Sequence, residues 1–219
     1  PYCDGGEHDK DTFSINLNTG MFKCFRASCG KQGHFVEMAR DFGYELDFGF
    51  EKKQYRKLPQ KEIITKPKAV EYLNGRGISR ETAEKYKITV QKKNENVLVF
   101  PFYDENNVMQ FVKYRNTKYN GHGNKEWCER DTMPILFGMG QCEDFEELII
   151  TEGQIDSLSV AEAGYKNAVS VPTGANGFTW LSVCWDWICK FKKVIVFGDY
   201  ERGKITLLDK LRSSLKTKV

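Results

Sequence analysis

The 219-residue chain has no apolar run long enough to cross a membrane, and its first residues do not form a secretory leader. Its net charge is small, at +3 from 33 Lys and Arg against 30 Asp and Glu, so composition alone does not predict nucleic-acid binding. The 7 cysteines are an odd number, which favours reduced thiols over a disulfide framework. We therefore expect one or two domains in a cytoplasm, with no membrane partner.

Two short apolar runs each end in acidic residues. Residues 148–150 lead to Glu152, and residues 194–197 lead to Asp199 and Glu201. Uniformly apolar runs of this length are typical of buried parallel strands, and functional groups gather at the carboxyl ends of such strands. If the two strands are neighbours, the acids converge on one edge and offer the oxygen ligands that Mg²⁺ or Mn²⁺ prefers. The candidate metal ligands are Glu152, Asp156, Asp199 and Glu201. The alternative is polar loop residues at strand ends.

Three of the cysteines lie near the amino end. Residues 12–17 alternate like a strand, and residues 21–25 predict a return strand after a turn. A zinc ribbon carries cysteine pairs at the ends of such a hairpin, and structural zinc takes four ligands. Cys24 and Cys29 would supply one pair, and Cys3 half of the other. The alternative is three buried free thiols.

A basic hairpin is expected in the middle of the chain, from residues 97–103 and 108–115. Lys113 and Arg115 are two positions apart on the second strand, so their side chains face the same side. Such a pair beside aromatic residues commonly holds phosphates while bases stack, although a solvated strand face is the alternative. Further candidates for nucleic-acid contact are Lys125, Arg26 and Lys31.

A basic segment, residues 51–68, precedes this hairpin. Pro59 and Pro67 are expected to break any helix, so we predict a mobile, solvated connector. It would act as a tether alone, or as a tether that also attracts DNA. Helices are predicted over residues 35–42 and 69–74, after an N-cap at Ser79, after Glu152, and in the aromatic segment before residue 194.

Two motifs resemble known families. Glu152-Gly153 followed by Asp156, with Asp199-Tyr200-Glu201 after the second strand, resembles the TOPRIM domain of primases and topoisomerases, where Asp-x-Asp is usual in place of Asp-Tyr-Glu. The cysteine region resembles the zinc-binding domain of DnaG-type and phage primases. That resemblance places the fourth zinc ligand directly before Pro1, and His8 is the candidate within the chain.

The resemblance implies an α/β chain, α+β overall, with a zinc ribbon in residues 1–50, the basic linker 51–68, a β-rich basic subdomain in 69–147 and a parallel-sheet TOPRIM domain in 148–219. It implies a DNA primase of phage or bacterial replication, which makes short RNA primers from ribonucleoside triphosphates on single-stranded DNA with Mg²⁺ or Mn²⁺. Its partner would be a replicative helicase, either fused downstream or separate. Asp199 and Glu201 would bind metal. Glu152 would be a third ligand or the general base, and the basic pair would hold the triphosphate or the template.

Two rival functions stay open. The chain could be a primase-like domain that has lost synthesis and only binds DNA for a helicase, or it could be a TOPRIM nuclease. A TOPRIM domain alone does not decide between them, because function depends on the site and not on the fold.

Overall fold

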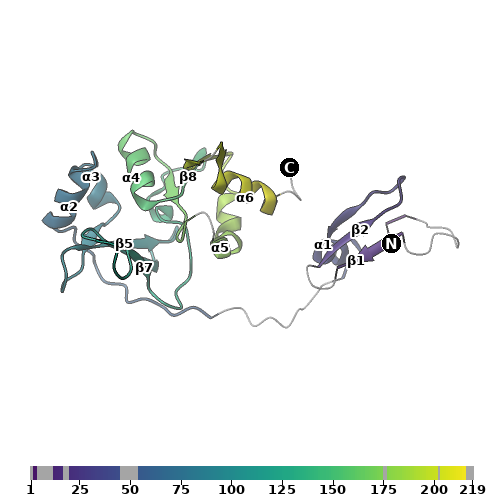
Figure 1. Cartoon of the computed structure of the whole chain (residues 1–219), viewed down its shortest axis with the longest axis horizontal. Coiled ribbons are helices and arrows are strands. Elements are labelled where there is room, and N and C mark those ends of the chain that lie inside the picture. Colours follow the sequence, from purple (N-terminus) through teal and green to yellow (C-terminus); the bar gives the residue numbers. More distant parts are fainter. Residues whose placement is uncertain are drawn as a thin grey trace. The chain divides into compact units, whose positions relative to one another are not determined.

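The computed structural model describes residues 2–3, 12–16, 20–44, 54–174, 177–201 and 203–215. The chain divides into two compact units, one of Pro1–Gln54 with Thr217–Val219 and one of Tyr55–Lys216 (Figure 1). None of the helices in the described ranges has both the length and the apolar character that crossing a membrane requires.

The first unit is a small antiparallel sheet with one helix. Its strands are β1 (Phe13–Ile15), β2 (Met21–Cys24) and β3 (Gln32–His34), in that order, and α1 (Phe35–Asp41) follows. The predicted hairpin and helix are both present, but β3, which ends at His34, was not expected. Phe22 and Cys24 point inward from β2, and the ring of Tyr2 stacks on Phe22 at 5.4 Å.

The second unit begins with two helices and an antiparallel sheet. The helices are α2 (Pro67–Asn74) and α3 (Arg80–Lys85), and the strands are β4 (Thr89–Val90), β5 (Val97–Tyr103), β6 (Met109–Asn116) and β7 (Glu126–Cys128), in the order β4-β5-β6-β7. The predicted hairpin is β5–β6. Ser79 caps α3 as expected, because its hydroxyl accepts from the backbone N–H of Thr82 at 3.2 Å.

A parallel sheet forms the rest of this unit. It comprises β8 (Glu147–Thr151), β9 (Ala168–Ser170) and β10 (Lys193–Phe197) in the order β10-β8-β9, with α4 (Gln154–Glu162), α5 (Thr179–Ile188) and α6 (Thr206–Leu215) around it and the 3₁₀ turn η1 (Met139–Gln141) before it. One hydrophobic core joins both sheets, with Phe137 beneath Tyr86 and Phe100. Trp180 and Trp187 are buried in it.

Residues 55–66 are mostly exposed, as expected of a solvated connector, but two side chains attach them to the antiparallel sheet. Leu58 is buried against Met109 and Val112, and the side-chain amide of Gln60 bonds both backbone groups of Met109, at 2.8 and 3.0 Å. These contacts fix the segment on the antiparallel sheet. Pro67 begins α2 instead of breaking a helix, because the first helical position needs no N–H donor. Residues 51–53 lie outside the described part.

Candidate active site

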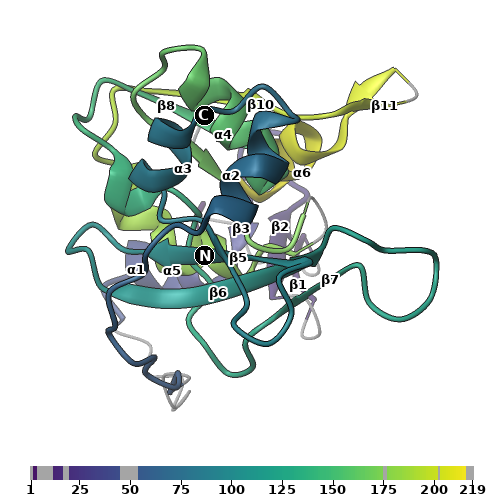
Figure 2. The same cartoon turned by 90° about the vertical axis from the view of Figure 1, so that its left-hand side faces the viewer.

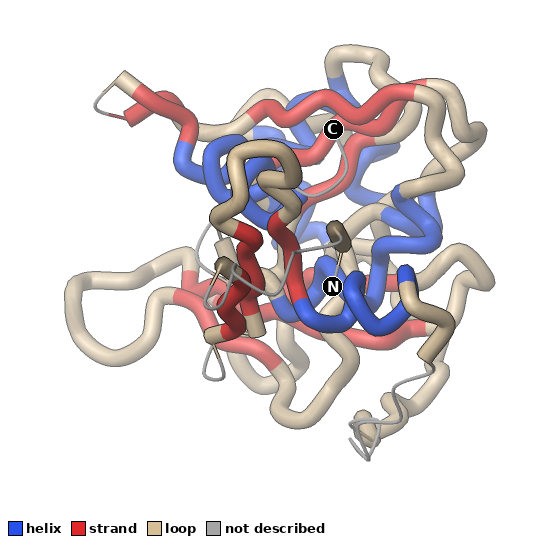
Figure 3. The backbone as a smooth tube through the Cα atoms, turned by 90° about the vertical axis from the view of Figure 1, so that its right-hand side faces the viewer, coloured by secondary structure: helices blue, strands red, loops and turns tan. Residues whose placement is uncertain are grey.

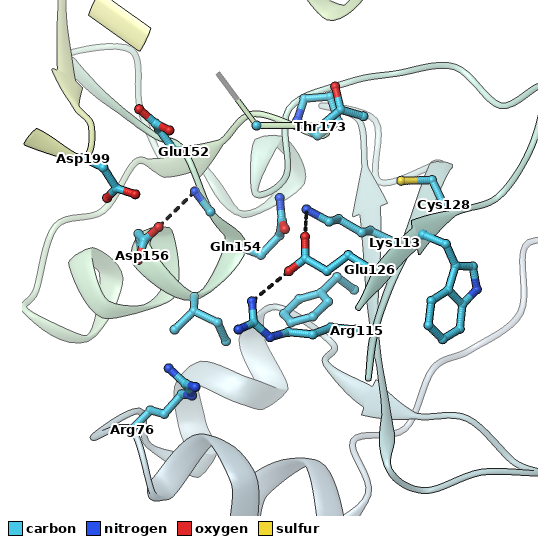
Figure 4. A pocket seen from close by; sticks show the side chains of 16 residues that line it. Arg76, Lys113, Arg115, Glu126, Cys128, Glu152, Gln154, Asp156, Thr173 and Asp199 are labelled. Carbon is cyan, nitrogen blue, oxygen red and sulfur yellow. Dashed lines mark hydrogen bonds and ion pairs between the residues drawn. The ribbon is translucent and has the colours of Figure 1, made fainter. Parts of the chain in front are cut away.

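Parallel pairing brings the two acidic motifs together. Strands β8 and β10 are adjacent, with Thr151 opposite Phe197, so Glu152 and Asp199 leave the sheet at the same edge. Asp156 reaches this edge from the first turn of α4, where its carboxylate accepts the backbone N–H of Gly153 at 3.0 Å. Figure 4 shows the three carboxylates gathered there. The adjacency of the two strands was the central prediction from sequence, and it is confirmed.

Gly198 makes room for the Glu152 carboxylate. A methyl group on Gly198 would lie 3.1 Å from Glu152 Oε1 and 2.7 Å from Cγ2 of Ile205, the latter closer than side-chain carbons pack. The absence of a side chain just before Asp199 therefore lets the two carboxylates share the edge. This close approach explains a glycine between β10 and Asp199 at a site where backbone conformation does not demand one.

The carboxylates repel one another electrostatically. Burial, and then the charge of Asp199, raise the pKa of Glu152, while the backbone amides of Asp199 and Leu207 oppose the rise. Burial and Asp199 likewise raise the pKa of Asp156. Two raised carboxyl pKa values at one edge indicate negative charge without sufficient compensation. A divalent cation would supply that compensation, and the oxygen donors suit Mg²⁺ or Mn²⁺.

Glu201 lies differently from the other three acids. It belongs to the short strand β11 (Tyr200–Glu201), which pairs with β12 (Lys204–Ile205) in a hairpin that projects from this unit in Figures 2 and 3. Its side chain is exposed and does not line the cavity that holds Glu152 and Asp199. Its charge still contributes, as the smallest cause, to the raised pKa of Glu152.

The wall opposite the acids is basic. Lys113 and Arg115 project from β6 into the same cavity, which has a volume of about 490 Å³. Both side chains meet the carboxylate of Glu126 on β7, Lys113 Nζ at 2.8 Å and Arg115 Nη1 at 2.7 Å (Figure 4). Burial alone raises the pKa of Glu126, but these two cations outweigh it and the pKa is lowered. The predicted same-side orientation of the basic pair is confirmed.

Three polar residues of the cavity escaped the sequence reasoning: Arg76, Glu126 and Gln154. Glu126 is placed beside Arg115 by the pairing of β7 with β6, which the sequence did not predict. Arg76 follows α2 in a glycine-flanked turn that carried no basic pattern. Gln154 is buried, and its amide donates to Ser170 Oγ at 3.1 Å and to the carbonyl of Val171 at 2.9 Å, which ties α4 to β9. Lys125 is exposed outside this cavity.

The cysteines form a separate site in the first unit. The thiol sulfurs of Cys3, Cys24 and Cys29 lie within 4.8 Å of one another, and those of Cys3 and Cys24 are 3.9 Å apart. Zn–S bonds of about 2.3 Å in a tetrahedron place sulfurs roughly 3.8 Å apart, so the three thiols fit three ligands of one zinc ion. Lys31 lies 3.7 Å from Asp41 and above the ring of Tyr2.

Arg26 is half-buried beside these thiols. His8, the candidate fourth ligand within the chain, lies outside the described residues. The roles of Arg26 and Lys31 in nucleic-acid contact stay predictions.

Comparison with known proteins gives a consistent result. No protein-family model matches the chain. A Twinkle homolog protein of Arabidopsis thaliana, chloroplastic/mitochondrial, is 32% identical over 80% of this chain, which spans only 24% of that protein. A primase homolog protein of the same plant is 26% identical over 98% of this chain and 67% of its own length.

Solved structures share the fold. The primase fragment of the bacteriophage T7 primase–helicase protein superimposes with a TM-score of 0.56 at 22% identity, over 93% of this chain and 80% of that one. The zinc-binding and RNA polymerase domains of the Aquifex aeolicus primase give 0.57 at 18% identity, over 100% and 70%. The predicted resemblance is therefore confirmed: this chain is primase-like in sequence and in fold.

Proposed function

We propose that this chain is the priming part of a DNA primase, with the zinc ribbon followed by a TOPRIM catalytic core. The observation that carries the proposal is the shared cavity of Glu152, Asp156 and Asp199 with Lys113 and Arg115. Acids on one wall and cations on the other suit a reaction between phosphates and a metal-activated hydroxyl. Similarity to the primase homolog and to the T7 primase fragment supports the assignment.

Each wall would have its own task. Glu152 and Asp199 would hold divalent metal at the sheet edge, and Asp156 would add a carboxylate from α4. A divalent ion held there would supply activation of the 3′-hydroxyl and neutralisation of the pyrophosphate that leaves. Lys113 and Arg115 would bind the phosphates of the incoming ribonucleotide, or those of the template, opposite the acids. Arg76 adds a third cation to the lining of the cavity.

Ribonucleotide incorporation on a single-stranded DNA template tests the proposal. Glu152→Gln keeps the size of the side chain and removes its charge, so we expect at least a hundredfold loss of Mg²⁺-dependent synthesis, about 2.7 kcal/mol in transition-state stabilisation. Glu129→Gln is the control, because this carboxylate belongs to a half-buried residue, as that of Glu152 does, but does not line the cavity. Synthesis by Glu152→Gln at the wild-type rate contradicts the proposal.

One observation favours a second candidate, a primase-like domain that binds DNA without synthesis. Glu201 stands where an Asp is usual, and its exposed side chain lies outside the cavity. Wild-type protein that binds single-stranded DNA but incorporates no ribonucleotide, with Mg²⁺ or with Mn²⁺, would support this candidate. Mg²⁺-dependent cutting of DNA without incorporation would instead indicate a nuclease.

The proposal also includes a bound zinc ion, a helicase partner and a cellular compartment. The three thiols would bind structural Zn²⁺ with a fourth ligand that stays unassigned. A helicase partner is suggested by the T7 primase–helicase protein. For a phage or bacterial protein we predict the cytoplasm. The alternative is an organelle, because the similar Twinkle homolog protein is named chloroplastic/mitochondrial.

A further inference from the structure

The basic wall of the cavity contains an acid. Glu126 is the cross-strand partner of Arg115 on β7, and residues directly opposite one another in a sheet share a face. Its carboxylate bonds the guanidinium of Arg115 with one oxygen and the ammonium of Lys113 with the other, at 2.7 and 2.8 Å (Figure 4). One carboxylate thereby joins two cations that come from alternate positions of a single strand.

The burial of these groups is uneven. The side chain of Lys113 is only 9% exposed, that of Arg115 is 22% exposed and that of Glu126 is 32% exposed. A nearly buried ammonium group needs an anion, since removing one partner of a buried ion pair leaves an uncompensated charge. Glu126 is the anionic partner that Lys113 contacts in the described structure.

We propose that Glu126 is a positioning residue, which holds the Lys113 ammonium and the Arg115 guanidinium together and directs them at the phosphates of a nucleoside triphosphate. This inference rests on the proposed function. A carboxylate next to a phosphate-binding site would be expected to weaken binding, because it repels the phosphates. The geometry favours positioning because both oxygens of Glu126 are used, and because the buried Lys113 would lose its fixed place without it.

Binding of MgATP to the full chain, measured by calorimetry, tests the inference without any need for synthesis. Positioning predicts that Glu126→Gln weakens binding about tenfold, the loss expected for one charge-assisted hydrogen bond. If Glu126 acts only as a repelling charge, the same change leaves binding equal or makes it tighter. Equal or tighter binding by this variant overturns the inference and leaves the proposed function intact. Wild-type protein that does not bind MgATP overturns both.

A double-mutant cycle identifies the route of the effect. If Glu126 works through Lys113, then Lys113→Gln removes the larger part of the effect of Glu126→Gln, and the two losses do not add. Additive losses overturn the inference.

Glu129→Gln is the matched control. Glu129 bonds Tyr114 at 2.7 Å and Arg56 at 2.6 Å, is 34% exposed and lies outside the cavity, so it should leave MgATP binding unchanged. If Glu126→Gln unfolds the protein, Glu126→Asp keeps the charge, shortens the reach by one methylene group and should give a smaller loss. Wild-type affinity in Glu126→Asp would then overturn the inference.

Discussion

Removing one acid from the sheet edge should stabilise the protein when no metal is bound. Burial and mutual repulsion raise the pKa of Glu152 and of Asp156, and Asp199 contributes to both shifts. A carboxyl group whose pKa is raised by folding binds protons more readily in the folded state. Its ionisation therefore lowers the free energy of unfolding; this loss is absent below the ordinary pKa and grows as pH rises through the folded pKa. Asp199→Asn removes the shared repelling charge.

The expected gain is small but measurable. Asp199 is the second cause, after burial, of both raised pKa values, and an interaction between partly exposed charges contributes at most about 1 kcal/mol, so we expect a gain of up to about 1 kcal/mol. For a unit of this size that raises the melting temperature by roughly 2–4 °C. The gain should be present at pH 8, well above the ordinary values of 4.5 for Glu152 and 3.8 for Asp156, and should vanish as pH falls toward them.

Thermal unfolding followed by circular dichroism, in EDTA and in Mg²⁺, provides the assay. In Mg²⁺ the order should reverse, because the wild type gains stability from bound metal that the variant binds less well. Asp186→Asn, on the exposed face of α5, is the control and should change the melting temperature little. A variant that melts at or below the wild-type temperature in EDTA at pH 8 would refute the electrostatic reasoning.

Two other changes test the metal site and the cavity. Cys24→Ala, or a strong zinc chelator, should release zinc and unfold the first unit, while the second unit keeps its own melting transition. Unfolding would appear in NMR spectra as lost chemical-shift dispersion of the first unit. A dispersed spectrum of this unit without zinc would contradict a structural zinc site. Gly198→Ala would place its methyl group 3.1 Å from Glu152 Oε1, so the carboxylate should shift by a few tenths of an ångström and ribonucleotide incorporation should fall by about tenfold. Gly75→Ala is the control, because its methyl group would lie 3.4 Å from its nearest atom, the carbonyl oxygen of Tyr72, and incorporation should be unchanged. Equal rates for the two variants would refute the steric argument.

Sequence periodicity predicted the long elements well. The apolar runs of β8 and β10, and the hairpin β5–β6, have patterns typical of strands, so their places and the meeting of Glu152 with Asp199 could be foreseen. Burial was predicted correctly for β8 but not for β10, an edge strand of its sheet in which Val194 is 42% and Phe197 63% exposed. Strands β3 and β7 have 3 residues each, too few for any period to show. Missing β7 also hid Glu126, because its position beside Arg115 depends on strand pairing.

Other errors arose from tertiary contacts that local sequence does not encode. Residues 55–66 have the composition of a connector, yet Leu58 and Gln60 find partners on β5 and β6 that lie some fifty positions later. Asp199-Tyr200-Glu201 predicted two ligands from one turn. The chain instead enters β11 directly after Asp199, and pairing with β12 fixes Glu201 on an exposed hairpin. A motif thus gives the order of residues, while the turn that follows decides which of them share a cavity.

The distribution of charge in the cavity links metal and phosphate. Its lining contains three cations, on Arg76, Lys113 and Arg115, and four carboxylates, on Glu126, Glu152, Asp156 and Asp199. Because the carboxylates outnumber the cations, the cavity alone does not attract a polyphosphate. Divalent ions at the sheet edge would reverse that balance, while Glu126 keeps the basic pair in place before any phosphate arrives. The acids lie at the edge of one sheet and the basic pair lies on the neighbouring sheet. This separation favours binding of metal and nucleotide to the cavity together.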